Sequence, residues 1–237
     1  MTARDLQPAH AAPPARTHQE LLAEEAARYA LLRRVAPALR HHLAGMLQPI
    51  GMVAAIMERR LQAAQPDLTV IRDSSKSIST LTRSAAGASM GLLTWLDPKE
   101  NSNGPLHVSV EECVGMLTTE LAFRGFNVSN TVASSDMATS VFALRSVFTA
   151  ALIALTDAAL TPASIVISSQ VVDGKIGVVI SVSSEPGALA AEDPPSYRKL
   201  DWDDVQALAT AEQVGLSHGP GRAEMHFAAA ENADVIV

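Results

Sequence analysis

Two adjacent histidines are the side chains of this chain best suited to group-transfer chemistry. They lie in the segment Arg40-His41-His42-Leu43-Ala44-Gly45-Met46-Leu47-Gln48-Pro49. A neutral imidazole is a good nucleophile near pH 7, and a phosphoryl group bound to it stays reactive enough to be passed on. On the residues alone, two polar side chains on a solvated helix face explain the pair equally well.

Helical spacing separates the two histidines. Each helical step rotates the side chain by roughly 100°. His41 is two residues from both Leu39 and Leu43, so it points nearly opposite the apolar stripe that those leucines belong to. His42 is adjacent to Leu43 and lies on the flank of that stripe. We therefore expect His41, rather than His42, to face solvent and a docking partner.

The residues one turn either side of His41 leave room around its imidazole. They are Pro37 and Gly45, and neither projects a bulky side chain. Both cost helix stability, because proline removes a hydrogen bond and glycine adds entropy to the unfolded chain. The clearance would suit a site that must admit the reactive carboxylate of another protein.

The element that would carry these histidines is a long helical hairpin. Residues 18 to 96 read as helix except at Gln65-Pro66-Asp67, a turn in which Asp67 can cap the second helix. Apolar or small contact positions recur at steps of mostly three and four residues. On the first helix they are Leu32, Val35, Leu39, Leu43, Met46, Ile50, Val53, Met57 and Leu61, and on the second Ile71, Ser74, Ile78, Leu81, Ala85, Ala88, Leu92 and Trp95. Because one hairpin buries only one face of each helix, we expect a homodimer built on a four-helix bundle.

The second half of the chain changes in composition. A polar linker, Asp97 to Pro105, leads to a region that we predict to be α+β, with a mixed sheet covered by helices on one side. We expect a short strand at His107–Val110, helices at 111–124, 138–160 and 203–214, and a hairpin of strands 164–172 and 175–183 around Asp173-Gly174. The predicted domains are a flexible tail (1–18), the hairpin (19–97), the linker (98–106) and the α+β domain (107–237).

Composition limits the function classes. The formal net charge of −7 argues against a general nucleic-acid binder. The single cysteine, Cys113, excludes an internal disulfide, and we expect a small buried residue there. No secretory signal is visible, and the apolar run Val147–Leu160 is too short to span a bilayer. We therefore expect a cytoplasmic protein without a membrane partner.

The histidine segment resembles the dimerisation and phosphotransfer domain of sensor histidine kinases. The pattern His41-His42-Leu43-Ala44-Gly45-Met46-Leu47-Gln48 matches the family's histidine, both leucine positions and the trailing polar residue. It departs at His42, where the family has an acidic residue. With the hairpin and the following domain, the resemblance covers roughly residues 20 to 237. It implies that His41 is the phosphoacceptor, with His42 the weaker candidate.

The α+β region resembles the ATP-binding domain of those kinases with its nucleotide site eroded. Where the family has a glutamate, a metal-binding asparagine and an alanine, this chain has Ile153, Asp157 and Ala158. The family's Asp-x-Gly-x-Gly reads Ser-Ser-Glu-Pro-Gly at 183–187, and a Pro-rich segment up to Lys199 replaces the glycine-rich lid. Little is left to hold phosphates or Mg²⁺.

In this loss of nucleotide-binding residues, the chain resembles the dimeric histidine phosphotransferases of bacterial phosphorelays. That resemblance implies phosphoryl relay between receiver domains of response regulators, with no cofactor of the chain's own and with Mg²⁺ supplied by the receiver. Arg40, Gly45 and Gln48 are the expected partner-binding residues, while Arg34 is expected on a solvated face. Because the acid after the histidine is missing, and Gly45 stands where dual-function kinases have threonine or asparagine, we expect neither ATP-driven kinase nor efficient phosphatase activity.

Three alternatives remain open at this point. The chain could be a non-catalytic pseudo-histidine-kinase that docks and regulates a receiver or a kinase. It could be a divergent ATP-dependent histidine kinase in which Asp157 replaces the asparagine as metal ligand. It could also be an unrelated helical scaffold.

Overall fold

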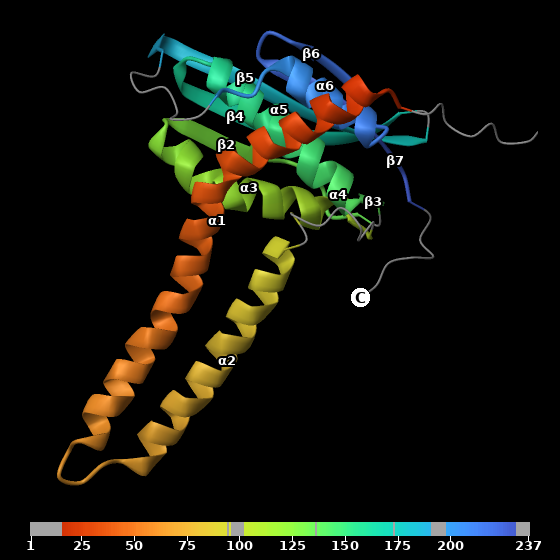
Figure 1. Cartoon of the computed structure of the whole chain (residues 1–237). Coiled ribbons are helices and arrows are strands. Elements are labelled where there is room, and N and C mark those ends of the chain that lie inside the picture. Colours follow the sequence, from red (N-terminus) through yellow and green to blue (C-terminus); the bar gives the residue numbers. More distant parts are fainter. Residues whose placement is uncertain are drawn as a thin grey trace, which may run out of the picture.

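The computed structural model describes residues 16–93, 95, 102–135, 137–172, 174–190 and 198–230. It has the predicted α+β architecture: a long helical hairpin followed by a mixed sheet with helices on one face (Figure 1). The elements in chain order are α1 (His18–Leu61), α2 (Leu68–Leu93), β1 (Asn103–Pro105), α3 (Leu106–Phe123), β2 (Phe126–Asn130), β3 (Ala138–Ser140), α4 (Val141–Ala143), the π-helical turn η1 (Leu144–Phe148), α5 (Thr149–Ala158), β4 (Thr161–Val172), β5 (Lys175–Leu189), α6 (Trp202–Ala211), β6 (Gly215–Gly219) and β7 (Arg222–Ala228).

Local sequence signals explain where each of the two helices of the hairpin begins. Thr17 and Glu20 form a capping box, in which the Thr17 hydroxyl accepts a hydrogen bond from the Glu20 amide and the Glu20 carboxylate accepts one from the Thr17 amide. Asp67 caps α2 as predicted, because its carboxylate accepts a hydrogen bond of 2.9 Å from the Thr69 amide. The two helices then run side by side and project away from the rest of the molecule (Figure 1).

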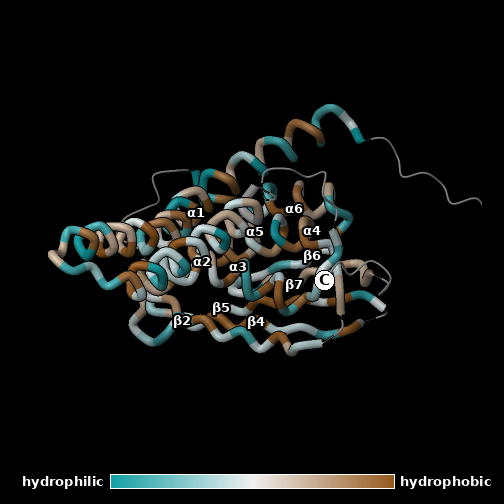
Figure 2. Tube along the Cα trace, turned by 90° about the horizontal axis from the view of Figure 1, so that it is seen from below, coloured by the Kyte–Doolittle hydropathy of each residue, from teal (hydrophilic) through white to brown (hydrophobic). Residues whose placement is uncertain are grey.

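The sheet is mixed, as expected. Its order is β2-β4-β5-β7-β6, in which only β2 and β4 pair in parallel. Strands β4 and β5 pair as the predicted hairpin, and Gly174 between them has a positive φ (73°), which suits the turn, while Asp173 lies outside the described residues. Helices α1, α3, α5 and α6 lie on one side of the sheet (Figure 2). Alternate sheet residues, among them Ile165, Ile180 and Phe227, are buried against those helices.

Several predicted elements need correction. Residues 107–110 are not a strand, because the helical spacing of buried Leu106, Val110 and Cys113 extends α3 back to residue 106. Residues 138–140 are strand β3, paired with β1, instead of the start of a helix. The linker prediction at 98–106 therefore includes strand β1. The sequence also predicts closing strands around 225–228 and 235–237; the first lies within β7, and the second lies outside the described residues.

The helix α4–η1–α5 forms the centre of the core. Within the described residues, Val141–Ala158 is the one helix long and apolar enough to cross a membrane by length and composition, and 78% of it is buried inside the molecule. Cys113 packs here and is fully buried, as predicted. Burial raises the pKa of the Cys113 thiol to about 12, because a thiolate would have to leave water.

Cys113 therefore reports on unfolding. Since the thiolate is the reactive species, the native chain should not react with dithionitrobenzoate at pH 8. In urea it should release one equivalent of thionitrobenzoate, because it has one cysteine. Stoichiometric reaction of the native chain within minutes would contradict the burial of this side chain.

Candidate functional site

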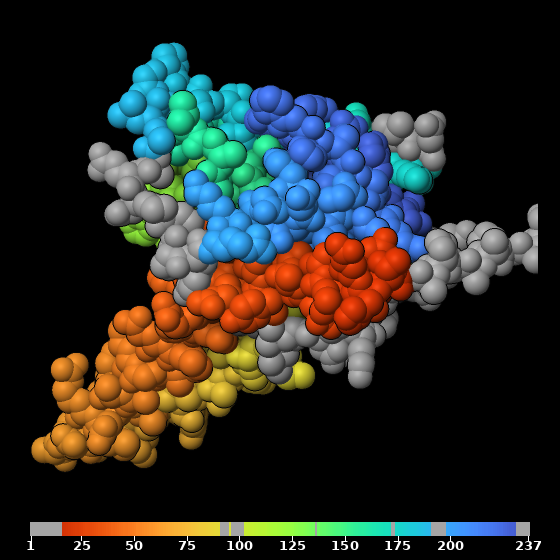
Figure 3. Space-filling view, turned by 45° about the horizontal axis from the view of Figure 1, so that its top comes forward, coloured from red at the N-terminus to blue at the C-terminus, as the bar shows by residue number. Residues whose placement is uncertain are grey.

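The predicted phosphoacceptor lies just beyond the part of α1 that packs on the sheet's helical layer. In the first half of α1, Ala27, Leu31, Arg34 and Val35 are buried. Figure 3 shows this half lying along α6, while the second half of α1 projects with α2. His41 therefore lies where α1 has left the α/β layer.

Both histidines are exposed. The structure places His41 and His42 in solvent, whereas the neighbouring stripe residues Leu39 and Leu43 are half-buried. Exposure alone thus does not select His41 over His42, in contrast to the expectation from helical phase. His41 follows Arg34 by seven residues, two helical turns, so it lies on nearly the same side of α1 and about 10 Å further along the axis.

The three residues predicted to bind a partner are all exposed. Gly45 and Gln48 follow His41 by four and seven residues, which places them on the same side of the helix. A Cβ added at Gly45 would meet no atom within 4 Å. Arg40 is exposed beside His41. The structure therefore brings His41, Gly45 and Gln48 to one open face, with a cation at its edge.

A buried ion pair joins α1 to the core helix α5, and the sequence did not predict it. Arg34 donates hydrogen bonds from both terminal nitrogens to the two carboxylate oxygens of Asp157, one of them at 2.9 Å. The side chains of Arg34 and Asp157 are each only 3% exposed. Arg124 from the end of α3 adds a second cation, 3.0 Å from Asp157. Glu120 lies 3.9 Å from Arg34.

This network corrects the prediction for Arg34. The sequence analysis expects Arg34 on a solvated face, but the structure buries it in a bidentate pair with Asp157. The signal was present in the spacing: Ala27 and Leu31 lie seven and three residues before Arg34 and face the same layer. Arg40, the arginine predicted to bind a partner, is exposed and adjoins His41.

Asp157 is the position at which a divergent kinase would need a metal ligand. Its carboxylate oxygens instead accept the guanidinium hydrogen bonds of Arg34, and Arg124 also lies against them. The guanidinium groups of Arg34 and Arg124 would repel a metal cation at that site. Ile153 is buried in the core, and residues 183–187 belong to strand β5 rather than to a glycine-rich loop. Among the described residues, no group of three or more histidine, cysteine, aspartate or glutamate side chains could hold a metal ion.

Comparisons with known proteins give a consistent but distant likeness. No family model matches the chain, and no curated protein matches it. Solved structures of histidine kinases are similar to it. These include the Acinetobacter baumannii kinase AdeS (16% identity, 74% of this chain and 93% of that one, TM-score 0.40). Another is a histidine kinase from Burkholderia phymatum (11% identity, 90% and 98%, TM-score 0.41).

A third similar structure is the histidine kinase ThkA in complex with the response regulator protein TrrA. It shares 13% identity with this chain, and the match covers 92% of this chain and 69% of that one at a TM-score of 0.41. At these identities and TM-scores the likeness says nothing about function. The site must therefore be judged by its own residues.

The ion pair predicts a clear mutational pattern. Asp157→Asn leaves the buried Arg34 without its carboxylate and should lower the free energy of unfolding by about 3–5 kcal/mol. Arg34→Met leaves Asp157 paired with Arg124 alone and should lower it by less, about 1–3 kcal/mol. The double variant Arg34→Met/Asp157→Leu removes both charges and should recover part of that loss, although Arg124 then loses a partner. Urea unfolding followed by circular dichroism measures these changes.

The matched control is Arg59→Met, which removes an exposed arginine from the same helix. It should change the free energy of unfolding by no more than about 0.5 kcal/mol. If Arg34→Met proved as mild as Arg59→Met, the pair would not hold α1 to the core.

Proposed function

We propose that this chain is a histidine phosphotransferase that relays phosphoryl groups between receiver domains of response regulators, through a phosphohistidine at His41. The observation that carries the proposal is the open face of His41, Gly45 and Gln48 on a helix fixed to the α/β layer. A receiver can approach this face without displacing a bulky side chain, since the space around Gly45 is empty. We further propose that the protein acts in the cytoplasm, without a membrane or nucleic-acid partner.

Phosphoryl transfer between a receiver and His41 can run in both directions. A ring nitrogen of neutral His41 attacks the phosphorus of the receiver's aspartyl phosphate with its lone pair. A nitrogen–phosphorus bond forms, the phosphorus–oxygen bond to aspartate breaks, and the aspartate leaves as a carboxylate. The proton on the other ring nitrogen is released to solvent as the imidazolium relaxes. The reverse sequence delivers the group to the aspartate of a second receiver.

The α/β half has no metal-binding part in this proposal. Its best metal-ligand candidate, Asp157, is neutralised by Arg34 and Arg124. The receiver would therefore supply Mg²⁺ and its acidic pocket, and the chain would need no cofactor of its own. Arg40 would raise the association rate with an acidic receiver surface more than it would raise the affinity.

Label transfer tests the proposal directly. Purified receiver domains, labelled on aspartate by an active histidine kinase and radiolabelled ATP and then freed of both, are mixed with the full chain. The wild type should gain acid-labile, alkali-stable label. His41→Gln should gain less than about 1% of it, because its side chain has no nucleophilic nitrogen, whereas His42→Gln should stay within about threefold of wild type.

The other outcomes separate the alternatives. Receiver binding without transfer would indicate the non-catalytic docking module. Label gained from ATP and Mg²⁺ alone would establish the divergent kinase and overturn the relay. Label that survives in His41→Gln but disappears in His42→Gln would move the site by one residue.

We also propose that the chain is a homodimer through the hairpin. Leu47, Ala54 and Leu61 lie at intervals of seven residues and so follow one side of α1. Leu47 is 54% and Leu61 49% exposed, which leaves a line of hydrocarbon in water along the single hairpin. A second copy placed against this line would bury it in a four-helix bundle.

A charge introduced on this line should separate the subunits. Leu47→Glu should convert a dimer into a monomer in multi-angle light scattering, because the carboxylate would be buried in the bundle. Met52→Glu is the matched control: Met52 is 60% exposed but lies about 140° further round α1. A Leu47→Glu chain that stayed dimeric, or a monomeric wild type, would place the interface elsewhere or exclude it.

A further inference from the structure

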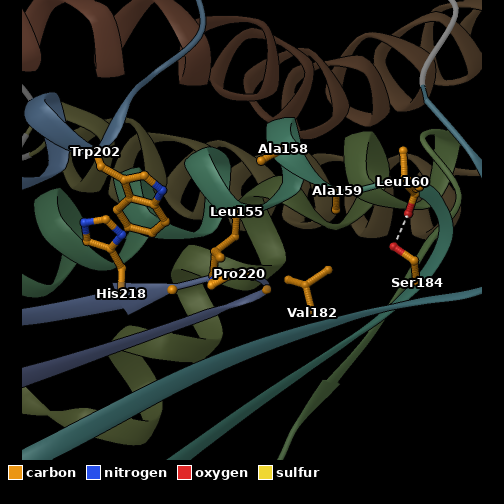
Figure 4. Close-up of a pocket in the computed structure, with 11 residues that line it drawn as sticks. Leu155, Ala158, Ala159, Leu160, Val182, Ser184, Trp202, His218 and Pro220 are labelled. Carbon is orange, nitrogen blue, oxygen red and sulfur yellow. Dashed lines mark hydrogen bonds between the residues drawn. The ribbon is translucent and has the colours of Figure 1, made fainter.

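A cavity lies at the end of α5, away from the histidines. It has a volume of about 760 Å³. Its lining comes from the end of α5 and the two residues that follow (Leu155, Ala158, Ala159, Leu160), from β5 (Val182, Ser184), from the first residue of α6 (Trp202), and from the end of β6 and the β6–β7 turn (His218 to Gly221). In Figure 4, Leu155 of α5 points down toward Pro220, and Val182 forms part of the floor of the cavity. A volume of this size is typical of small-molecule sites.

The lining carries no acidic or basic side chain other than an imidazole. None of its eleven residues is aspartate, glutamate, lysine or arginine. The Ser184 hydroxyl donates a hydrogen bond of 2.9 Å to the Leu160 carbonyl, so its proton is already used. An anionic ligand would lose its hydration here without gaining a countercharge from the lining, which disfavours its binding.

Two cations outside the lining, Lys199 and Arg222, already have partners. The Lys199 amine donates to the backbone carbonyl of Asp157, at 3.2 Å. Arg222, which follows the β6–β7 turn, pairs with Glu224 at 3.2 Å. Among the described residues, the lining therefore offers neither a carboxylate for a metal ion nor a lysine or arginine for a phosphate chain.

One wall of the cavity is flat and aromatic. The rings of Trp202 and His218 stack with centroids 4.0 Å apart and planes 5° from parallel. Figure 4 shows the pair at one end of the cavity, with Leu160 and Ser184 at the other. Gly221 keeps the turn close to the floor: it has φ +68°, and a Cβ there would lie 2.6 Å from the Val182 carbonyl oxygen. A planar wall between hydrocarbon surfaces favours a planar apolar ligand.

We infer that this cavity binds an uncharged, planar aromatic small molecule. Its hydrocarbon and aromatic lining selects for flat apolar rings, and its lack of countercharge selects against phosphates, sulfonates and carboxylates. This inference does not depend on phosphoryl transfer at His41.

A pair of dyes tests the charge selection. N-phenyl-1-naphthylamine and 8-anilinonaphthalene-1-sulfonate share one ring skeleton and differ by the sulfonate. In full-length Trp95→Phe, Trp202 is the sole tryptophan, so quenching of its emission by energy transfer reports binding beside it. The neutral dye should bind at least tenfold more tightly than the sulfonate. Equal or tighter binding of the sulfonate overturns the inference.

A filled cavity tests the location. Ala158 is exposed at the cavity edge, so Ala158→Phe can add a ring there without disturbing the core. In the Trp95→Phe background it should weaken the neutral dye at least tenfold. Ala55→Phe adds the same ring at an exposed position on the hairpin and should leave the affinity within twofold. Unchanged affinity in Ala158→Phe, with circular dichroism confirming the fold, overturns the inference.

Competition with ATP completes the test. Millimolar ATP with Mg²⁺ should not displace the neutral dye from the Trp95→Phe chain, because nothing in the lining compensates its phosphates. Displacement at micromolar ATP would show a nucleotide site and would overturn the selection for uncharged ligands.

Discussion

The buried pair of Arg34 and Asp157 is the contact on which the arrangement of this molecule depends. It joins the helix that carries His41 to the core helix α5 by two parallel hydrogen bonds. Both charges are out of water, so neither can leave the other without a large cost in desolvation free energy. Arg124 completes the neutralisation from α3. Three helices are therefore held at one point, and α1 has a fixed rotation relative to the sheet.

That rotation determines what the hairpin displays. His41 lies two turns beyond Arg34 on nearly the same side, so the ion pair sets the side of α1 on which His41 is exposed. An enzyme that takes phosphate from a nucleotide on its own second domain must bring that domain to its histidine. A buried bidentate pair between the two parts opposes such a movement, whereas a relay needs only a stable face for the next protein.

Sequence periodicity was sufficient for the elements that are long or have local turn chemistry. The hairpin, its Asp67 cap and the β4–β5 turn at Gly174 were all predictable, because their signals lie within a few residues. Strands β1 and β3 were not, since each is three residues long and exists by pairing with the other. The prediction for Arg34 failed for a related reason: an isolated arginine reads as solvated until its partner, 123 residues away, is known.

One part of the candidate site is predictable from the sequence, and the other part is not. Exposure of His41, Gly45 and Gln48 follows from spacing, but the equal exposure of His42 depends on where α1 leaves the α/β layer. The surroundings of Asp157 and of the end of α5 likewise required the structure. The sequence leaves the partners of Asp157 open, while the structure shows a buried salt bridge there and, beside Trp202, a cavity with no aspartate, glutamate, lysine or arginine in its lining. The last turn of α5 therefore holds α1 through Asp157, while its neighbours Ala158 and Ala159 line an apolar space.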